Sequence, residues 1–217
     1  MRNSAALLLM WFFAGVGQAT GSVIYSNFGP GMTFDTTSGH SWTINGFLGP
    51  GTGQQAIAHQ FRPSGSYTFT DAQVALLLLS GPSSIAVFLQ EDSGGLPGAV
   101  LEEIDVIGLT AVPTVTVANS VLRPELQDGT LYWLTVVAGA PGVRAGWSWN
   151  SIGDTSTGTN FASTQGGSPV GPWTLNAGLT RGAFQIDGTP VPDPSTWALL
   201  GTGLAGLLTM RRRYSRR

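Results

Sequence analysis

The sequence has no cysteine among its 217 residues, which excludes disulfide bonds, thiolate metal sites and cysteine nucleophiles. It also has no lysine, and charged residues make up only 10% of the chain, against about 25% in an ordinary globular domain. Half of the ten arginines lie in the last seven residues, so residues 21–190 combine 11 acidic side chains with four arginines, a formal charge of −7. This acidic body argues against nucleic acid as a partner, because phosphate binding needs clustered basic residues.

The N-terminus has the three-part layout of a secretory signal peptide. Arg2 is followed by an apolar run from Ala5 to Val16 and then by Gly17-Gln18-Ala19, with small residues at the −3 and −1 positions. We therefore predict that residues 1–19 form a signal helix that is cleaved after Ala19. The alternative is a buried first helix, but such a helix should show a polar face and this run has none.

A second apolar run, residues 197–210, contains no charge and predicts a single transmembrane helix. Its 14 residues would span about 21 Å, against a bilayer core of about 30 Å. Arg211, Arg212 and Arg213 follow the run and would face the cytoplasm, leaving the body outside. The run also contains a Gly-x-Gly-x-x-Gly pattern at residues 201–206, but no strand precedes it and no acidic residue follows it. A dinucleotide site would need both.

The segment Val191-Pro192-Asp193-Pro194-Ser195-Thr196, followed by that apolar run and the arginine cluster, resembles the PEP-CTERM sorting signal. In this family a membrane-embedded protease, exosortase, is understood to recognise a Pro-Glu-Pro motif in Gram-negative bacteria that make exopolysaccharide. The resemblance maps the motif onto Pro192, Asp193 and Pro194, with Asp in place of the usual Glu. It implies a sorting signal over residues 190–217, with its motif at 191–196 and an Arg-rich tail at 211–217. A plain C-terminal anchor behind a Pro-rich hinge is the alternative.

The resemblance also implies where the protein goes and what it meets. It implies a precursor anchored in the inner membrane, processing by an exosortase-type protease, and a destination at the cell surface or in the extracellular matrix. Exopolysaccharide is the natural neighbour of proteins that carry this signal.

The body between the two ends predicts an all-β fold, an antiparallel sandwich or jelly roll over residues 20–189. Residues 84–90 alternate, with Ile85, Val87 and Leu89 on one face, and residues 131–137 are apolar on both faces, as in a central strand. Residues 74–79 are similar, and residues 112–118 alternate between Thr and Val. Segments rich in Gly, Pro, Asp and Ser separate these runs and predict turns, among them Asp92-Ser93-Gly94-Gly95.

Three segments of the body carry a second resemblance. "IYSNFGPGMTFDTTSGHSWTINGF", "VFLQEDSGGLPGAVLEE" and "LQDGTLYWLTVVA" followed by "AGWSWN" are similar to the choice-of-anchor R domain. This resemblance covers roughly residues 24 to 187. It implies an exported β-rich domain and supplies no activity and no functional residues.

Candidate metal and catalytic groups are few. Asp154 lies in an oxygen-rich loop and is a calcium candidate, since calcium takes six to eight oxygen ligands. His40 and His59 have no zinc-ligand spacing and no nucleophile-elbow motif accompanies them, so we predict polar surface histidines. Glu102 should point away from Glu103 and Asp105 on a strand, and solvated edge charge is expected of them. No cofactor is predicted.

Three tryptophans are candidates for carbohydrate contact: Trp147, Trp149 and Trp173. Trp147 and Trp149 are two residues apart and share a face if they lie on a strand. Aromatic rings can stack on sugars, but tryptophan is equally a core residue of β-sandwiches. The sequence thus predicts an exported, non-enzymatic surface or matrix protein. A carbohydrate-binding module that uses exposed Trp residues is the alternative, and a secreted hydrolase is a third reading.

Overall fold

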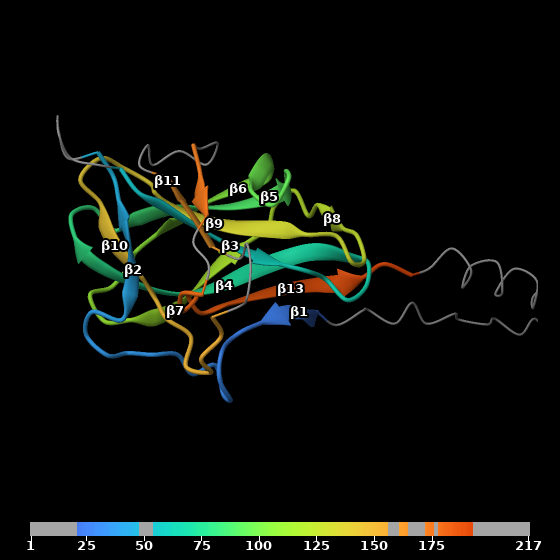
Figure 1. Cartoon of the computed structure of the whole chain (residues 1–217), viewed down its shortest axis with the longest axis horizontal. Helices are drawn as coiled ribbons and strands as arrows, with labels where there is room; N and C mark the ends of the chain where they lie inside the picture. The colour runs from blue at the N-terminus through green and yellow to red at the C-terminus, as the bar shows by residue number, and fades with distance from the viewer. Residues whose placement is uncertain (1–20, 48–53, 156–160, 165–171, 176–177, 193–217) are drawn as a thin grey trace, which may run out of the picture.

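The computed structural model describes residues 21–47, 54–155, 161–164, 172–175 and 178–192. Within these ranges every regular element is a β-strand, and the strands form two antiparallel sheets (Figure 1). The all-β prediction is therefore confirmed. The predicted signal helix (1–19) and transmembrane helix (197–210) lie outside the described residues, among which no helix is long and apolar enough to cross a membrane.

The first sheet has seven strands in the order β1-β13-β4-β10-β2, with β7 and β8 also pairing with β4. At 14 residues, β4 is long enough to pair with β13 and β10 in succession as well as with β7 and β8. The strands are β1 (Ser22–Ser26), β2 (Ser41–Asn45), β4 (Tyr67–Ser80), β7 (Thr114–Asn119), β8 (Glu125–Leu126), β10 (Arg144–Ser148) and β13 (Phe184–Pro190).

The second sheet has six strands in the order β12-β11-β3-β9-β5-β6. The predicted central strand at residues 131–137 is confirmed, because β9 lies between β3 and β5. The strands are β3 (Ala56–Phe61), β5 (Ser84–Asp92), β6 (Pro97–Ile107), β9 (Tyr132–Ala138), β11 (Phe161–Thr164) and β12 (Thr174–Leu175).

One hydrophobic core joins the two sheets. Ile85, Val87 and Leu89 of β5 are buried in it, as their alternation predicts, together with Leu76 of β4 and Phe184 of β13. Because side chains of both sheets enter the same core, the two layers form a β-sandwich. The more specific jelly-roll topology stays a prediction.

The turns follow from backbone conformations that glycine tolerates. Between β5 and β6, Gly94 and Gly95 have φ values of 65° and 84°, and the Gly95 N–H donates to Asp92 Oδ2 at 3.0 Å. This confirms the predicted hairpin turn. Between β4 and β5, Gly81 has a φ of 86°, and a Cβ there would collide with the carbonyl of Gly142. Any other residue would strain the backbone and displace that neighbour.

The two ends of the described body lie together. β1 and β13 run antiparallel and side by side (Figure 1), with Ser22 opposite Gly188. The first described residues and the last strand therefore meet at one end of the sandwich.

Candidate functional site

The first candidate site is the junction between β13 and the Pro-rich motif. Pro190, the last residue of β13, is paired with Tyr67 of β4. One residue further, the Val191 N–H donates to the Ser66 carbonyl at 2.9 Å. Val191 is half-buried and Pro192 is exposed. The motif therefore begins in the sheet and leaves it at Pro192.

The rest of the predicted sorting machinery lies outside the described residues. This holds for Asp193 and Pro194 of the motif, for Arg211, Arg212 and Arg213, and for the predicted cleavage site at Ala19.

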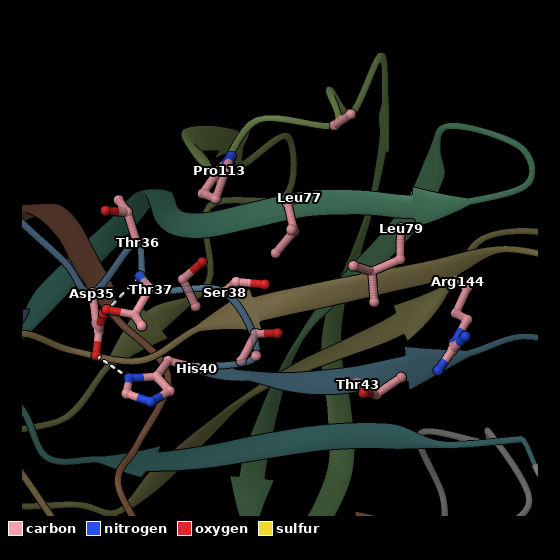
Figure 2. Close-up of a pocket in the computed structure, with 14 residues that line it drawn as sticks. Asp35, Thr36, Thr37, Ser38, His40, Thr43, Leu77, Leu79, Pro113 and Arg144 are labelled. Atoms are coloured by element: carbon pink, nitrogen blue, oxygen red, sulfur yellow. Dashed lines mark hydrogen bonds and ion pairs between the residues drawn. The ribbon is translucent and has the colours of Figure 1, made fainter.

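The second candidate site is a groove of about 430 Å³ on the first sheet (Figure 2). Its floor crosses three strands, since Thr43 of β2 pairs with Gly146 of β10, which pairs with Leu77 of β4. A Cβ at Gly146 would lie 2.5 Å from Leu77 Cδ2 and 2.8 Å from Ser41 Oγ. The absent side chain at Gly146 is therefore what lets Leu77 pack across this floor.

The groove combines apolar and polar walls. Leu77 and Leu79 supply the apolar surface, and six hydroxyl side chains supply the polar one. Arg144 stands at one end beside Thr43, with Asp35 and His40 at the other end (Figure 2). The hydroxyl side chains are Thr36, Thr37, Ser38, Ser41, Thr43 and Ser148. Such a surface suits a ligand with hydroxyl groups and an apolar face.

A fixed charge marks the acidic end of the groove. Asp35 accepts hydrogen bonds from the Thr37 N–H at 2.8 Å and pairs with His40 Nδ1 at 2.6 Å. Hydrogen bonds from Thr37 and His40 lower the pKa of Asp35 to about 2. The His40 ring in turn stacks on Trp149, with ring centroids 4.7 Å apart.

The structure does not assemble the three candidate tryptophans into one platform. Trp147 is fully buried in the core and donates from Nε1 to the Ala183 carbonyl at 2.9 Å, so its ring is closed to a sugar. Trp149 is half-buried beside His40 and Trp42. Trp173 packs instead against clusters of the second sheet. The core alternative holds for Trp147.

The prediction of two surface histidines is wrong for His59. Its side chain is fully buried, and Nε2 accepts the Gly182 N–H at 2.9 Å. This bond requires Nε2 to carry no proton, which fixes the imidazole as a structural acceptor. Strand β3 is buried along its whole length, so alternation in the sequence did not mark an exposed face there.

Asp154, the calcium candidate, faces a cation of the protein itself. Its Oδ2 lies 3.2 Å from Arg181 Nη1 and accepts hydrogen bonds from Tyr25 at 3.3 Å and from Asn27 at 3.4 Å. Burial raises the pKa of Tyr25 to about 12. Among the residues described here, no group of three or more His, Cys, Asp or Glu side chains is placed to hold a metal ion.

The expectation of solvated edge charge is wrong for Glu102. Glu102 does point away from Glu103 and Asp105, but it is buried while they are exposed. Its carboxylate accepts hydrogen bonds from Ser120 Oγ and the Val121 N–H at 2.6 Å each, and from the Leu122 N–H at 2.9 Å. Glu102 therefore fastens the segment after β7 to the edge strand β6.

Comparison with known protein families identifies a sorting signal that begins at the end of β13. Residues 190–213 match the family described as the PEP-CTERM protein-sorting motif. The match begins at Pro190, the last residue of β13. A search for similar sequences among curated proteins gives no match. The motif implies a protein exported by a Gram-negative bacterium, anchored in the membrane before processing, and recognised by the membrane protease exosortase.

Proposed function

We propose that this chain is a non-enzymatic protein of the cell surface or extracellular matrix, delivered there by an exosortase-type system and associated with exopolysaccharide. The observation that carries the proposal is the sorting-motif match, which starts where the last strand of the sandwich ends. The sequence pattern adds a signal peptide cleaved after Ala19 and a body similar to the choice-of-anchor R domain.

The environment of the buried polar groups supports a scaffold rather than an enzyme. His59, Glu102 and Arg181 are all buried, and each is bonded to backbone or side-chain groups of the fold. Groups held in this way stabilise the sandwich and are not free to move protons on a substrate. In this proposal the body is a passive module whose destination is set by the C-terminal signal.

The test compares three proteins in the native host: the parent, a variant with Pro192, Asp193 and Pro194 all replaced by Ala, and Asp193→Glu as the matched control. Intact masses are measured separately for cell envelope and medium. We expect the parent and Asp193→Glu to begin near Thr20 and to lack Arg211 to Arg217, and the triple-alanine variant to keep them in the membrane. If all three mature proteins keep these arginines, the tail is only an anchor and the proposed sorting is wrong.

A carbohydrate-binding module is the second candidate function, and the groove of Figure 2 favours it over the tryptophans. Its six hydroxyl side chains and Arg144 can bind sugar hydroxyl or carboxylate groups above an apolar floor. The test is binding of the host's purified exopolysaccharide to the parent and to Arg144→Gln, with the exposed Arg123→Gln as control. Equal binding by the parent and Arg144→Gln would place any polysaccharide site elsewhere.

A further inference from the structure

The segment that carries the sorting motif is poor in backbone donors. Three of its five residues from 190 to 194 are proline, which has no N–H group. Only Val191 and Asp193 can donate a backbone hydrogen bond. In the folded sandwich the Val191 N–H is already used, because it donates to the Ser66 carbonyl at 2.9 Å.

A protease that binds this segment as an extended strand needs those donors. Extended peptides are recognised largely through main-chain hydrogen bonds, with side-chain pockets adding specificity. While Val191 is bonded to Ser66, its N–H group is not available to the sorting enzyme. The folded body therefore competes with the enzyme for this donor.

We propose that the last pairing of β13 is a gate, and that exosortase engages the motif fully only after Val191 has separated from Ser66. This inference rests on the proposed sorting function. The contact is autoinhibitory, because the closed sandwich keeps Val191, the first residue of the motif, bonded to Ser66.

The opening is local. Pro190 has no N–H group, so the last residue of β13 cannot donate a backbone hydrogen bond to β4. Further back, Gly188 is paired on both sides, with Ser22 of β1 and with Phe69 of β4. We therefore expect fraying to stop at Gly188 and the sandwich to stay intact when the gate opens.

The size of the effect follows from one backbone hydrogen bond. The net contribution of such a bond to stability lowers the fraction of molecules in which Val191 is separated from Ser66 by about two- to tenfold. The apparent affinity of a ligand falls in proportion to the fraction of protein that is competent to bind it. We expect the closed gate to slow processing by a similar factor, of about two- to tenfold, relative to a motif that is free of the sheet.

The decisive experiment locks the gate with a disulfide. The chain has no cysteine of its own, so Ser66→Cys with Val191→Cys can form only one bond. A hydrogen-bonded antiparallel pair has Cα atoms about 5.5 Å apart, within the range that a disulfide spans. The matched control is Ser84→Cys with Ile107→Cys, a paired position at the end of β5 and β6 in the other sheet.

Processing is followed in the native host by pulse-chase and intact mass. We expect the oxidised 66–191 pair to accumulate as precursor and to be processed after a reductant is added, while the 84–107 pair and both single 66 and 191 variants are processed like the parent. Processing of the oxidised 66–191 pair at the parent's rate would overturn the gate and leave the sorting function intact. A parent that keeps Arg211 to Arg217 would instead remove the sorting function itself.

A second variant keeps the proposal testable if the 66–191 disulfide does not form. Insertion of Gly-Ser-Gly-Ser between Val191 and Pro192 leaves the pairing of Val191 with Ser66 as it is and supplies free N–H groups directly before Pro192. We expect the insertion to raise the rate of processing by about two- to tenfold. An unchanged or lower rate would show that the pairing of Val191 with Ser66 does not limit access.

Discussion

Replacement of the buried Glu102 should weaken the sandwich far more than replacement of its exposed neighbour Glu103. The Glu102 side chain is on the inner side of the edge strand β6 and only 2% of the residue is exposed. Its carboxylate is the acceptor for one hydroxyl and two backbone N–H groups of residues 120–122. In Glu102→Ala all three donors lose this acceptor.

The magnitude follows from those three bonds. Each hydrogen bond to a charged group contributes about 1.5–3 kcal/mol to the free energy of unfolding. Val121 and Leu122 are 84% and 69% exposed, so water replaces much of what their N–H groups lose. We therefore expect a net loss of about 2–3 kcal/mol, which for a domain of this size lowers the melting temperature by about 5–10 °C.

Two measurements check this estimate on the full chain. Thermal unfolding gives the change in stability, with Glu103→Ala as the matched control, for which we expect a change within about 0.5 kcal/mol. Hydrogen exchange gives the cause, because the amides of Val121 and Leu122 should lose protection in Glu102→Ala and keep it in Glu103→Ala. Equal melting temperatures for the two variants, or unchanged exchange at these amides, would refute the role of Glu102.

Two further predictions concern carboxylates of the first sheet. Burial raises the pKa of Asp71 above 3.8, and Asp187 directly opposite it on β13 raises the pKa further. Protonation of Asp71 therefore stabilises the folded state. This stabilisation is complete below pH 3.8 and is lost as pH rises through the pKa of Asp71 in the folded protein. Asp71→Asn should therefore raise the free energy of unfolding at pH 7 by about 0.5–1 kcal/mol, seen as a higher melting temperature. This gain should vanish below pH 3.8. A gain that persists below pH 3.8 would show that the charge of Asp71 is not its cause. Asp154→Ala leaves the buried Arg181 without its carboxylate partner and should lower the free energy of unfolding, measured by chemical denaturation, by about 3 kcal/mol. Neither EDTA nor calcium added after it should change the melting temperature of the parent. A melting temperature that falls in EDTA and recovers in calcium would instead make Asp154 a metal ligand.

Local pattern was enough to predict several of the strands. Alternation in residues 84–90 places Ile85, Val87 and Leu89 on one face, and all three lie in the shared core. The run at residues 131–137, apolar on both faces, becomes β9 with a strand on either side. Both predictions succeed because the period of a strand is a property of consecutive residues.

Long-range pairing could not be predicted in the same way. Glu102 differs from Glu103 only in the face that it presents, and its partners come from a segment that begins 18 residues later. Asp154 meets Tyr25 across 129 residues of sequence, so the loop composition that suggests calcium says nothing of Arg181. The spacing of Trp147 and Trp149 gives a shared face without saying whether that face is inside. Each of these outcomes depends on the register between strands that are distant in the sequence.

The position of β13 links the fold to the sorting sequence. β13 is the last strand of the described chain, yet it lies inside its sheet between β1 and β4, and its Phe184 and Ile186 are fully buried in the core. The core of the sandwich is therefore complete only when the residues up to Ile186 are in place. The residue after β13, Val191, is held by Ser66, and Pro192 is the first residue of the motif to stand clear of the sheet. Because the family match begins at Pro190, the last residue of the strand that completes the core is also the first residue of the matched sorting sequence, and the state of this strand end determines whether Val191 is available to the sorting enzyme.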